Sequence, residues 1–309
     1  MIIVALSDIH LRETPPSKRI DNYLDALCYK INQIFDYLKE LRESHTDKIV
    51  LAIGGDVFDS CKASNALKSL AIDLFGRMYT YLDEIVAVAG QHDMRWHSTD
   101  LTNTPINVLH TSRVLTILGK EPLIITDNDK SFHFYGASYG EEIPVPSSNN
   151  NILLVHQMIS PGDHWNGLVN FTLCSTLLKS VNKYDLIISG DNHQTFNYKN
   201  RILNSGSLMR LKIDQVDHKP GLFVWHNSAI IFVPFEISPS NEIFDLNEIE
   251  YQKEINENMK EWILALDDIS EIEEFNFVEE IESWMNTHPD DDVNAILKEC
   301  IACSSKELS

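Results

Sequence analysis

The sequence predicts an α/β fold with a small, acidic, helical C-terminal appendage. Short apolar runs rich in β-branched residues alternate with amphipathic helical patterns, which is typical of layered α/β domains. After Pro234 the composition changes, because a segment rich in Ser, Pro and Asn leads into an acidic stretch with few strand patterns. These two observations predict two domains, residues 1–236 and residues 237–309.

Strand and helix patterns alternate along the first of these domains. Apolar residues between Ile20 and Leu41 fall on one helical stripe, those between Leu67 and Met78 form a second, and residues 172–182 a third. Because strands and helices alternate, we expect parallel pairing with right-handed crossovers. The expected strands are residues 2–6, 49–53, 85–89, 132–136, 152–155, 186–189, 201–204, 222–226 and 229–233.

The charge of the chain is concentrated at its C-terminal end. Of the formal net charge of −21, residues 237–309 contribute −16 and the first 236 residues only −5. Nucleic-acid-binding domains usually carry a basic patch, and none is evident here, which argues against unaided DNA binding. No apolar run approaches the roughly 20 residues of a membrane span. The apolar N-terminus fits a buried strand better than a signal peptide.

The five cysteines are scattered along the chain, which favours a reducing compartment. We therefore expect a cytoplasmic protein without membrane association, or one in the host cytoplasm if its source is viral.

Five polar clusters each follow a predicted strand, where α/β folds place their functional sites. Each cluster brings an imidazole, carboxylate or amide group, and such mixed nitrogen and oxygen ligands suit divalent transition metals. One cluster alone is weak evidence, but five in order predict a metal centre. The clusters are Asp8-Ile9-His10, Gly54-Gly55-Asp56-Val57-Phe58-Asp59, Gly90-Gln91-His92-Asp93, His156, and Gly190-Asp191-Asn192-His193.

The order of these clusters over residues 1–236 resembles that of the calcineurin-like metallophosphoesterases, with D-x-H, G-D-x-x-D, G-N-H-D, a single His and G-H-x-H. The resemblance implies a four-layer β-sandwich flanked by helices, and two divalent metal ions. It also implies that His92 protonates the leaving oxygen and that Asp93 orients its ring. One implied set of ligands is Asp8, His10, Asp56 and His193, and the other is Asp56, Gln91, His156 and Asp191.

Two residues depart from the family pattern. Gln91 stands where the family has Asn, and Asp191 stands where it has His. Both are oxygen donors, so we expect the second metal to be Mn²⁺, or Mg²⁺, in preference to zinc. The alternative is a weakened second site with only one metal bound tightly.

Within the family, the chain is most similar to SbcD-type DNA repair exonuclease subunits, particularly their short phage relatives. The similarity rests on Gly55-Asp56-Val57-Phe58, on the stretch from Gly90 to His97, and on Asn204 to Leu211. It implies DNA as substrate, an SbcC-like coiled-coil ATPase subunit as partner, and a homodimer of the chain. Residues 243–303 are expected either to dock on that ATPase or to pack on the first domain.

Arg95 and His97 are candidate DNA contacts, with Trp96 between them as a residue that could stack on a base; the alternative is a purely structural loop. Two other functions remain open. The chain could be a phosphoesterase acting on nucleotides, cyclic nucleotides or phosphoproteins, or an inactive scaffold. The pair His92-Asp93 argues against a scaffold.

Overall fold

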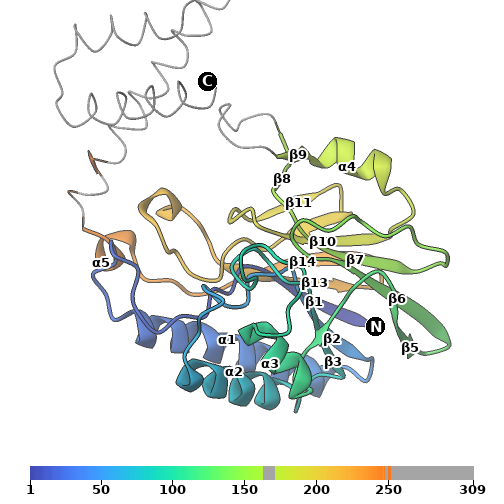
Figure 1. Cartoon of the computed structure of the whole chain (residues 1–309), viewed down its shortest axis with the longest axis horizontal. Coiled ribbons are helices and arrows are strands. Elements are labelled where there is room, and N and C mark those ends of the chain that lie inside the picture. Colours follow the sequence, from blue (N-terminus) through green and yellow to red (C-terminus); the bar gives the residue numbers. More distant parts are fainter. Residues whose placement is uncertain (163–170, 246, 248–249, 252–309) are drawn as a thin grey trace, which may run out of the picture. The chain divides into compact units, whose positions relative to one another are not determined.

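The computed structural model describes residues 1–162, 171–245, 247 and 250–251 (Figure 1). The chain divides into two compact units, Met1–Gln252 and Lys253–Ser309. The first unit contains two six-stranded sheets with helices, so the expected α/β class is confirmed. Among the described residues, no helix has the length and apolar character needed to cross a bilayer.

The first sheet has the strand order β14-β13-β1-β2-β3-β4. The first four strands along the chain, β1 to β4, are parallel, whereas β13 and β14 are antiparallel additions at one edge. Leu6 of β1 lies opposite Ile53 of β2, so the loops that follow these two strands start side by side. The strands are β1 (Ile2–Leu6), β2 (Ile49–Ile53), β3 (Glu84–Ala87), β4 (Thr116–Ile117), β13 (Gly221–His226) and β14 (Ala229–Pro234).

The second sheet has the order β11-β12-β10-β7-β6-β5. Its four central strands are parallel, and the end of β10 at Gly190 lies opposite the end of β7 at His156. A separate two-stranded ribbon joins β8 (Ile159–Ser160) to β9 (Thr172–Leu173). The strands of the sheet are β5 (Leu123–Asp127), β6 (Lys130–Ala137), β7 (Asn151–His156), β10 (Leu186–Gly190), β11 (Phe196–Tyr198) and β12 (Ile202–Asn204).

Alternating side chains divide the core into three apolar layers. In β1, Ile2, Val4 and Leu6 pack with the helices that cover the first sheet, whereas Ile3 and Ala5 pack with the second sheet. In β10, Leu186 and Ile188 face the first sheet, and Ile187 faces the opposite way. This is the period-2 pattern of strands buried on both faces.

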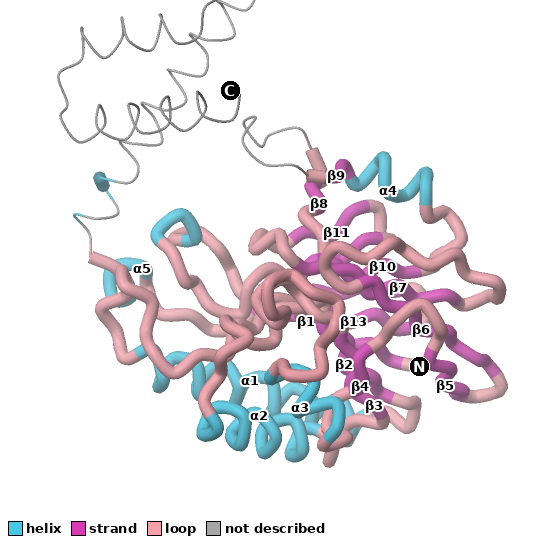
Figure 2. Tube along the Cα trace, viewed as in Figure 1, coloured by secondary structure: helices cyan, strands magenta, loops and turns pink. Residues whose placement is uncertain are grey.

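The helices complete four layers, as expected from the family resemblance. Figure 2 shows α1 (Tyr23–Ser44), α2 (Asn65–Met78) and α3 (Pro105–Thr111) together on one side of the sheets, with α4 (Cys174–Ser180) on the other. Leu38 of α1 and Leu74 of α2 belong to the apolar cluster of the first sheet, whereas Leu177 of α4 belongs to that of the second.

Several expected element boundaries are wrong. Helix α1 begins only at Tyr23, because the side chain of Asn22 caps its first turn by accepting from the backbone N–H of Asp25; Ile20 is 61% exposed. The helix expected over residues 172–182 is shorter, since β9 takes its first two residues. Helix α3 and strands β4, β5, β8, β9 and β11 were not predicted, and most are too short to show a period.

The first compact unit also extends beyond the boundary expected at residue 236. Helix α5 (Ser240–Ile243) packs back on it, and Ile243 and Phe244 are buried with Ile213. The Arg210 guanidinium supports this segment by donating to the carbonyl of Ser238 and the hydroxyl of Ser240. The expected docking helices within residues 243–303 lie almost entirely outside the described residues.

Candidate metal centre

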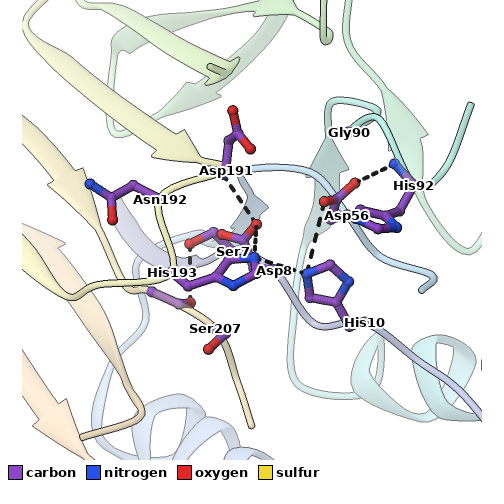
Figure 3. A network of polar contacts seen from close by, with 12 residues as sticks. Ser7, Asp8, His10, Asp56, Gly90, His92, Asp191, Asn192, His193 and Ser207 are labelled. Carbon is purple, nitrogen blue, oxygen red and sulfur yellow. Dashed lines mark hydrogen bonds and ion pairs between the residues drawn. The ribbon is translucent and has the colours of Figure 1, made fainter. Parts of the chain in front are cut away.

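The carboxyl ends of five parallel strands bring the predicted site residues to one edge of the two sheets. The loop after β1 carries Asp8 and His10, and the loop after β2 carries Asp56. The loop after β3 carries Gln91 and His92, His156 ends β7, and the loop after β10 carries Asp191 and His193. Figure 3 shows Asp8, His10, Asp56 and His193 turned toward one another.

The backbone at this edge is held in an uncommon conformation. Asp8, His10 and Asp56 have φ near +50°, and Asp191 has φ of 82°. Non-glycine residues rarely occupy this left-handed region, and such strain is concentrated at functional sites. Backbone hydrogen bonds hold the strained loops together, since the N–H of Asp8 donates to Gly55 and that of His10 donates to Asp56, at 3.1 and 2.9 Å.

Two glycines allow these loops to approach closely. A Cβ at Gly90 would lie 2.0 Å from Oδ1 of Asp56 and 2.6 Å from its backbone nitrogen. A Cβ at Gly55, where φ is +104°, would lie 2.2 Å from Nδ1 of His156. Both positions therefore need glycine for the site to close around its polar side chains.

We expect Gly90→Ala to displace Asp56, to destabilise the protein by about 1–3 kcal/mol through overpacking, and to weaken metal binding. Denaturant unfolding and metal titration measure the two effects. Gly119→Ala is the matched control, because a Cβ there meets no atom within 4 Å. Equal unfolding free energies and equal metal affinities for the two variants would show that the close approach at Gly90 is unimportant.

The first group of candidate ligands consists of Asp8, His10 and His193, whose ligand atoms lie within 4.8 Å of one another. The Nε2 atoms of the two histidines face each other at 3.2 Å. Asp8 Oδ1 accepts from the backbone N–H of Asp191 at 3.1 Å, whereas Oδ2 is buried without a hydrogen-bond partner. A buried carboxylate oxygen without a partner is costly, and a cation would satisfy it.

Asp56 lies between this group and the rest of the site. Its Oδ1 accepts from the backbone N–H of His92 at 2.9 Å. Its Oδ2 lies 3.8 Å from Nε2 of His10 and 3.5 Å from Nε2 of His156, and is buried without a hydrogen-bond partner. This is the arrangement that a carboxylate shared by two cations requires.

The second group is linked through the amide of Gln91. The Oε1 of Gln91 lies 2.7 Å from Nε2 of His156, and its Nε2 donates to Oδ1 of Asp191 at 2.9 Å. The Nδ1 of His156 contacts the carbonyl of Gly54 at 2.7 Å, which fixes the ring and leaves Nε2 facing the site. The two departures from the family pattern, Gln91 and Asp191, are therefore direct neighbours.

The electrostatics of the site differ between its histidines. Burial lowers the pKa of His10 to about 3 and that of His193 to about 4. Both rings are thus neutral near pH 7, which is the form that binds metals. Burial also opposes protonation of His156, but Asp56 and Asp8 outweigh it and raise the pKa to about 10.

The carboxylates show the corresponding accumulation of negative charge. Burial raises the pKa of Asp8 and of Asp93 to about 7, and the charge of Asp56 adds to both shifts. Burial would also raise the pKa of Asp56, but His156 and His10 outweigh it and lower the pKa to about 2. Together with the unpartnered oxygens of Asp8 and Asp56, these mixed donors fit divalent cations.

His92 and Asp93 lie differently from expectation. His92 is exposed beside the buried ligands, and its Nδ1 lies 3.1 Å from the carbonyl of Asp59. Asp93 is fully buried, and its carboxylate accepts backbone N–H groups of Val57, Phe58 and Gly90. The carbonyl of Asp59 thus orients the His92 ring, and Asp93 instead ties the loops after β2 and β3 together.

Some residues that support the ligands were not predicted as such. The carboxylate of Asp59 lies 3.5 Å from Nδ1 of His10, and Arg12 holds it from the other side at 3.1 Å. Behind His193, the side chain of Gln215 lies 3.1 Å from Nδ1. Asp59 belongs to a recognisable motif, but neither Arg12 nor Gln215 carries a sequence signal, because their roles arise only when the loops meet.

Comparison with known proteins agrees with this geometry. The family described as calcineurin-like phosphoesterase matches residues 1–195. The chain belongs to this family. Calcineurin-like phosphoesterases are phosphoester hydrolases that bind two divalent metal ions, and the ligand groups of this chain lie where such ions are needed.

Similarity beyond the family is low. The calcineurin-like phosphoesterase resembles the 5′-nucleotidase precursor from Thermus thermophilus, with a TM-score of 0.44 and 12% sequence identity. The match covers 86% of this chain but only 59% of the nucleotidase. No curated protein sequence matches the chain.

The candidate DNA contacts lie at the rim of the phosphoesterase site. Arg95 and His97 are exposed in the loop after β3, directly beyond Asp93. The ring of His97 meets that of Tyr139 edge-on at 5.4 Å, and Tyr139 in turn meets His156 at 6.4 Å. Neither Arg95 nor His97 belongs to the candidate ligand groups.

Proposed function

We propose that the chain is a metal-dependent DNA phosphodiesterase, the nuclease subunit of an SbcCD-like recombination and repair complex. The observation that carries the proposal is an exposed histidine, His92, beside a buried set of ligands whose rim loop is solvent-accessible. Such a rim leaves room for a polymeric substrate. The similarity of the segments around Gly55, Gly90 and Asn204 to SbcD-type nucleases supports DNA in particular.

The two metal ions would share Asp56. Asp8, His10 and His193 complete the ligands of one ion, whereas Gln91, His156 and Asp191 complete those of the other. Mn²⁺ is the proposed ion and Mg²⁺ the alternative, because the second set replaces an imidazole with a carboxylate. When bound, two such ions polarise the phosphate and lower the pKa of a coordinated water.

The protein's own groups orient the reaction. The carbonyl of Asp59 accepts only, so Nδ1 of His92 carries a proton and Nε2 is the nitrogen that can deliver one to the leaving oxygen. The backbone N–H of the same histidine binds Oδ1 of Asp56, so the proton donor and the shared ligand are held together. This coupling fixes the acid relative to the scissile bond.

The proposed partner is a coiled-coil ATPase of the SbcC type, and a homodimer of the chain fits the same assembly. The charge of −5 over the first 236 residues supports a division of labour, because a partner would have to supply most of the DNA affinity. The apolar residues proposed to dock on it, such as Ile263, Phe275 and Trp284, lie outside the described residues.

We expect the purified protein to hydrolyse bis-p-nitrophenyl phosphate and to cleave DNA with Mn²⁺ or Mg²⁺, and to do neither in excess chelator. The assay compares linear duplex DNA, single-stranded DNA and the small diester, with and without the ATPase. Hydrolysis of the small diester without cleavage of either DNA, even with the ATPase present, would contradict the nuclease proposal. It would favour the alternative of a phosphoesterase acting on nucleotides, cyclic nucleotides or phosphoproteins.

A further inference from the structure

An exposed tryptophan projects from the rim of the site. Trp96 is 83% exposed, the highest value among the large apolar side chains that are exposed in the described part of the chain. An indole in water forgoes the burial that normally makes Trp a core residue. Its exposure therefore needs a reason beyond folding.

The backbone around Trp96 is strained in a way that maintains this exposure. Trp96 and His97 are consecutive non-glycine residues in the left-handed region, with φ of 52° and 56°. Each such residue costs about 1–2 kcal/mol. The turn is closed by a hydrogen bond from Ser98 N–H to the Arg95 carbonyl, and buried Met94 anchors its base. The loop is thus built to present the indole.

Arg95 is stacked on the tryptophan. Its guanidinium carbon lies 4.3 Å from the ring centroid of Trp96, a cation–π contact. The two side chains form a planar aromatic surface with a positive charge at its edge. A nucleobase can stack on the indole while an adjacent phosphate meets the guanidinium.

The same loop is connected to the catalytic edge. It starts at Gln91 and His92, and the rings of His97, Tyr139 and His156 follow one another edge-to-face from the loop into the site. A nucleotide whose phosphate lies beside His92 would therefore have a neighbouring base close to this loop.

We propose that Trp96 and Arg95 form a stacking platform for an unpaired nucleobase next to the scissile phosphodiester. The inference rests on the proposed nuclease function and adds a preference for single-stranded or frayed ends, because a paired base is already stacked. A protein partner is a weaker fit: residues 97–100 beyond the indole are exposed, polar side chains, whereas protein docking sites bury apolar anchors in larger patches.

The test compares two substrates with the same leaving group, thymidine 5′-(p-nitrophenyl phosphate) and methyl p-nitrophenyl phosphate. The wild-type protein should prefer the nucleoside ester. Trp96→Ala should lower kcat/KM for that ester by about 10- to 100-fold, mainly through KM, and leave the methyl ester within about twofold, since stacking contributes roughly 1–3 kcal/mol per base. Trp96→Phe should retain most of the preference.

Tyr251→Ala is the control variant, because it removes another exposed aromatic side chain, 62% accessible. An equal loss on both esters for Trp96→Ala, or no loss on either, would overturn the platform. So would a variant that keeps the nucleoside preference but no longer binds the ATPase.

Failure of the nuclease proposal can be told apart. If wild-type protein hydrolyses neither ester, the proposed function fails, and the platform is judged by binding alone. Oligothymidylate should then quench tryptophan fluorescence in the wild type and less so in Trp96→Phe. Equal quenching in the two proteins would overturn the platform. Hydrolysis of the methyl ester without nucleoside preference would contradict the platform alone.

Discussion

His92→Ala should lower the rate of DNA cleavage by about 10²- to 10⁴-fold while both metal ions remain bound. The reason is that the leaving group of DNA is an alkoxide that needs a proton, and His92 is the exposed imidazole beside the ligands. Its ring is held by the carbonyl of Asp59 at 3.1 Å. The measurements are single-turnover cleavage of an oligonucleotide and metal titration of the same preparations.

The chemical identity of the leaving group separates a general acid from a structural residue. p-Nitrophenolate departs without protonation, so His92→Ala should lose far less activity on bis-p-nitrophenyl phosphate than on DNA. His133→Ala serves as control, because His133 pairs with the start of β7, at the opposite end of that strand from His156. An equal loss on both substrates, or loss of metal from His92→Ala, would refute the acid assignment.

The ligand set was accessible from the sequence because it depends on one property of parallel sheets. Asp8, Asp56 and His156 each follow or end a β-branched run, and the carboxyl ends of such strands meet at one edge. Position along the chain therefore translated into position in space. The same reasoning gave the four layers, since strands such as β1 are apolar on both faces.

The role of Asp93 was not accessible in this way. Its carboxylate accepts from Val57 and Phe58, amides that belong to a different loop. Their direction is set by the left-handed backbone at Asp56, which no local pattern reveals. Likewise, Gln91 and Asp191 were each seen as departures from the family, and only the fold shows that they hydrogen-bond to each other. Short strands such as β4 and β8 escape prediction because two residues show no period.

Asp56→Asn should remove the shared ligand and lower the number of tightly bound ions from two to one or none. The amide is isosteric, and its oxygen can still accept from the His92 N–H, so the fold is preserved. What changes is Oδ2, the atom that lies 3.8 Å from Nε2 of His10 and 3.5 Å from Nε2 of His156. Because a neutral amide cannot offset two dications, activity should fall by at least several kcal/mol of transition-state stabilisation, on the order of 10³-fold.

Metal-dependent stabilisation gives a second measurement. An ion present at 100 times its Kd adds about 2.7 kcal/mol to the stability of the wild-type protein, and Asp56→Asn should lose most of this gain. Asp191→Asn is the graded comparison, because it alters only the second set and should weaken one ion. Asp73→Asn, a change at a side chain that is 64% exposed, should alter neither. If Asp56→Asn retained two ions, the carboxylate would not be shared. If the wild type bound only one ion tightly, the contact between Gln91 and Asp191 would have replaced the second site.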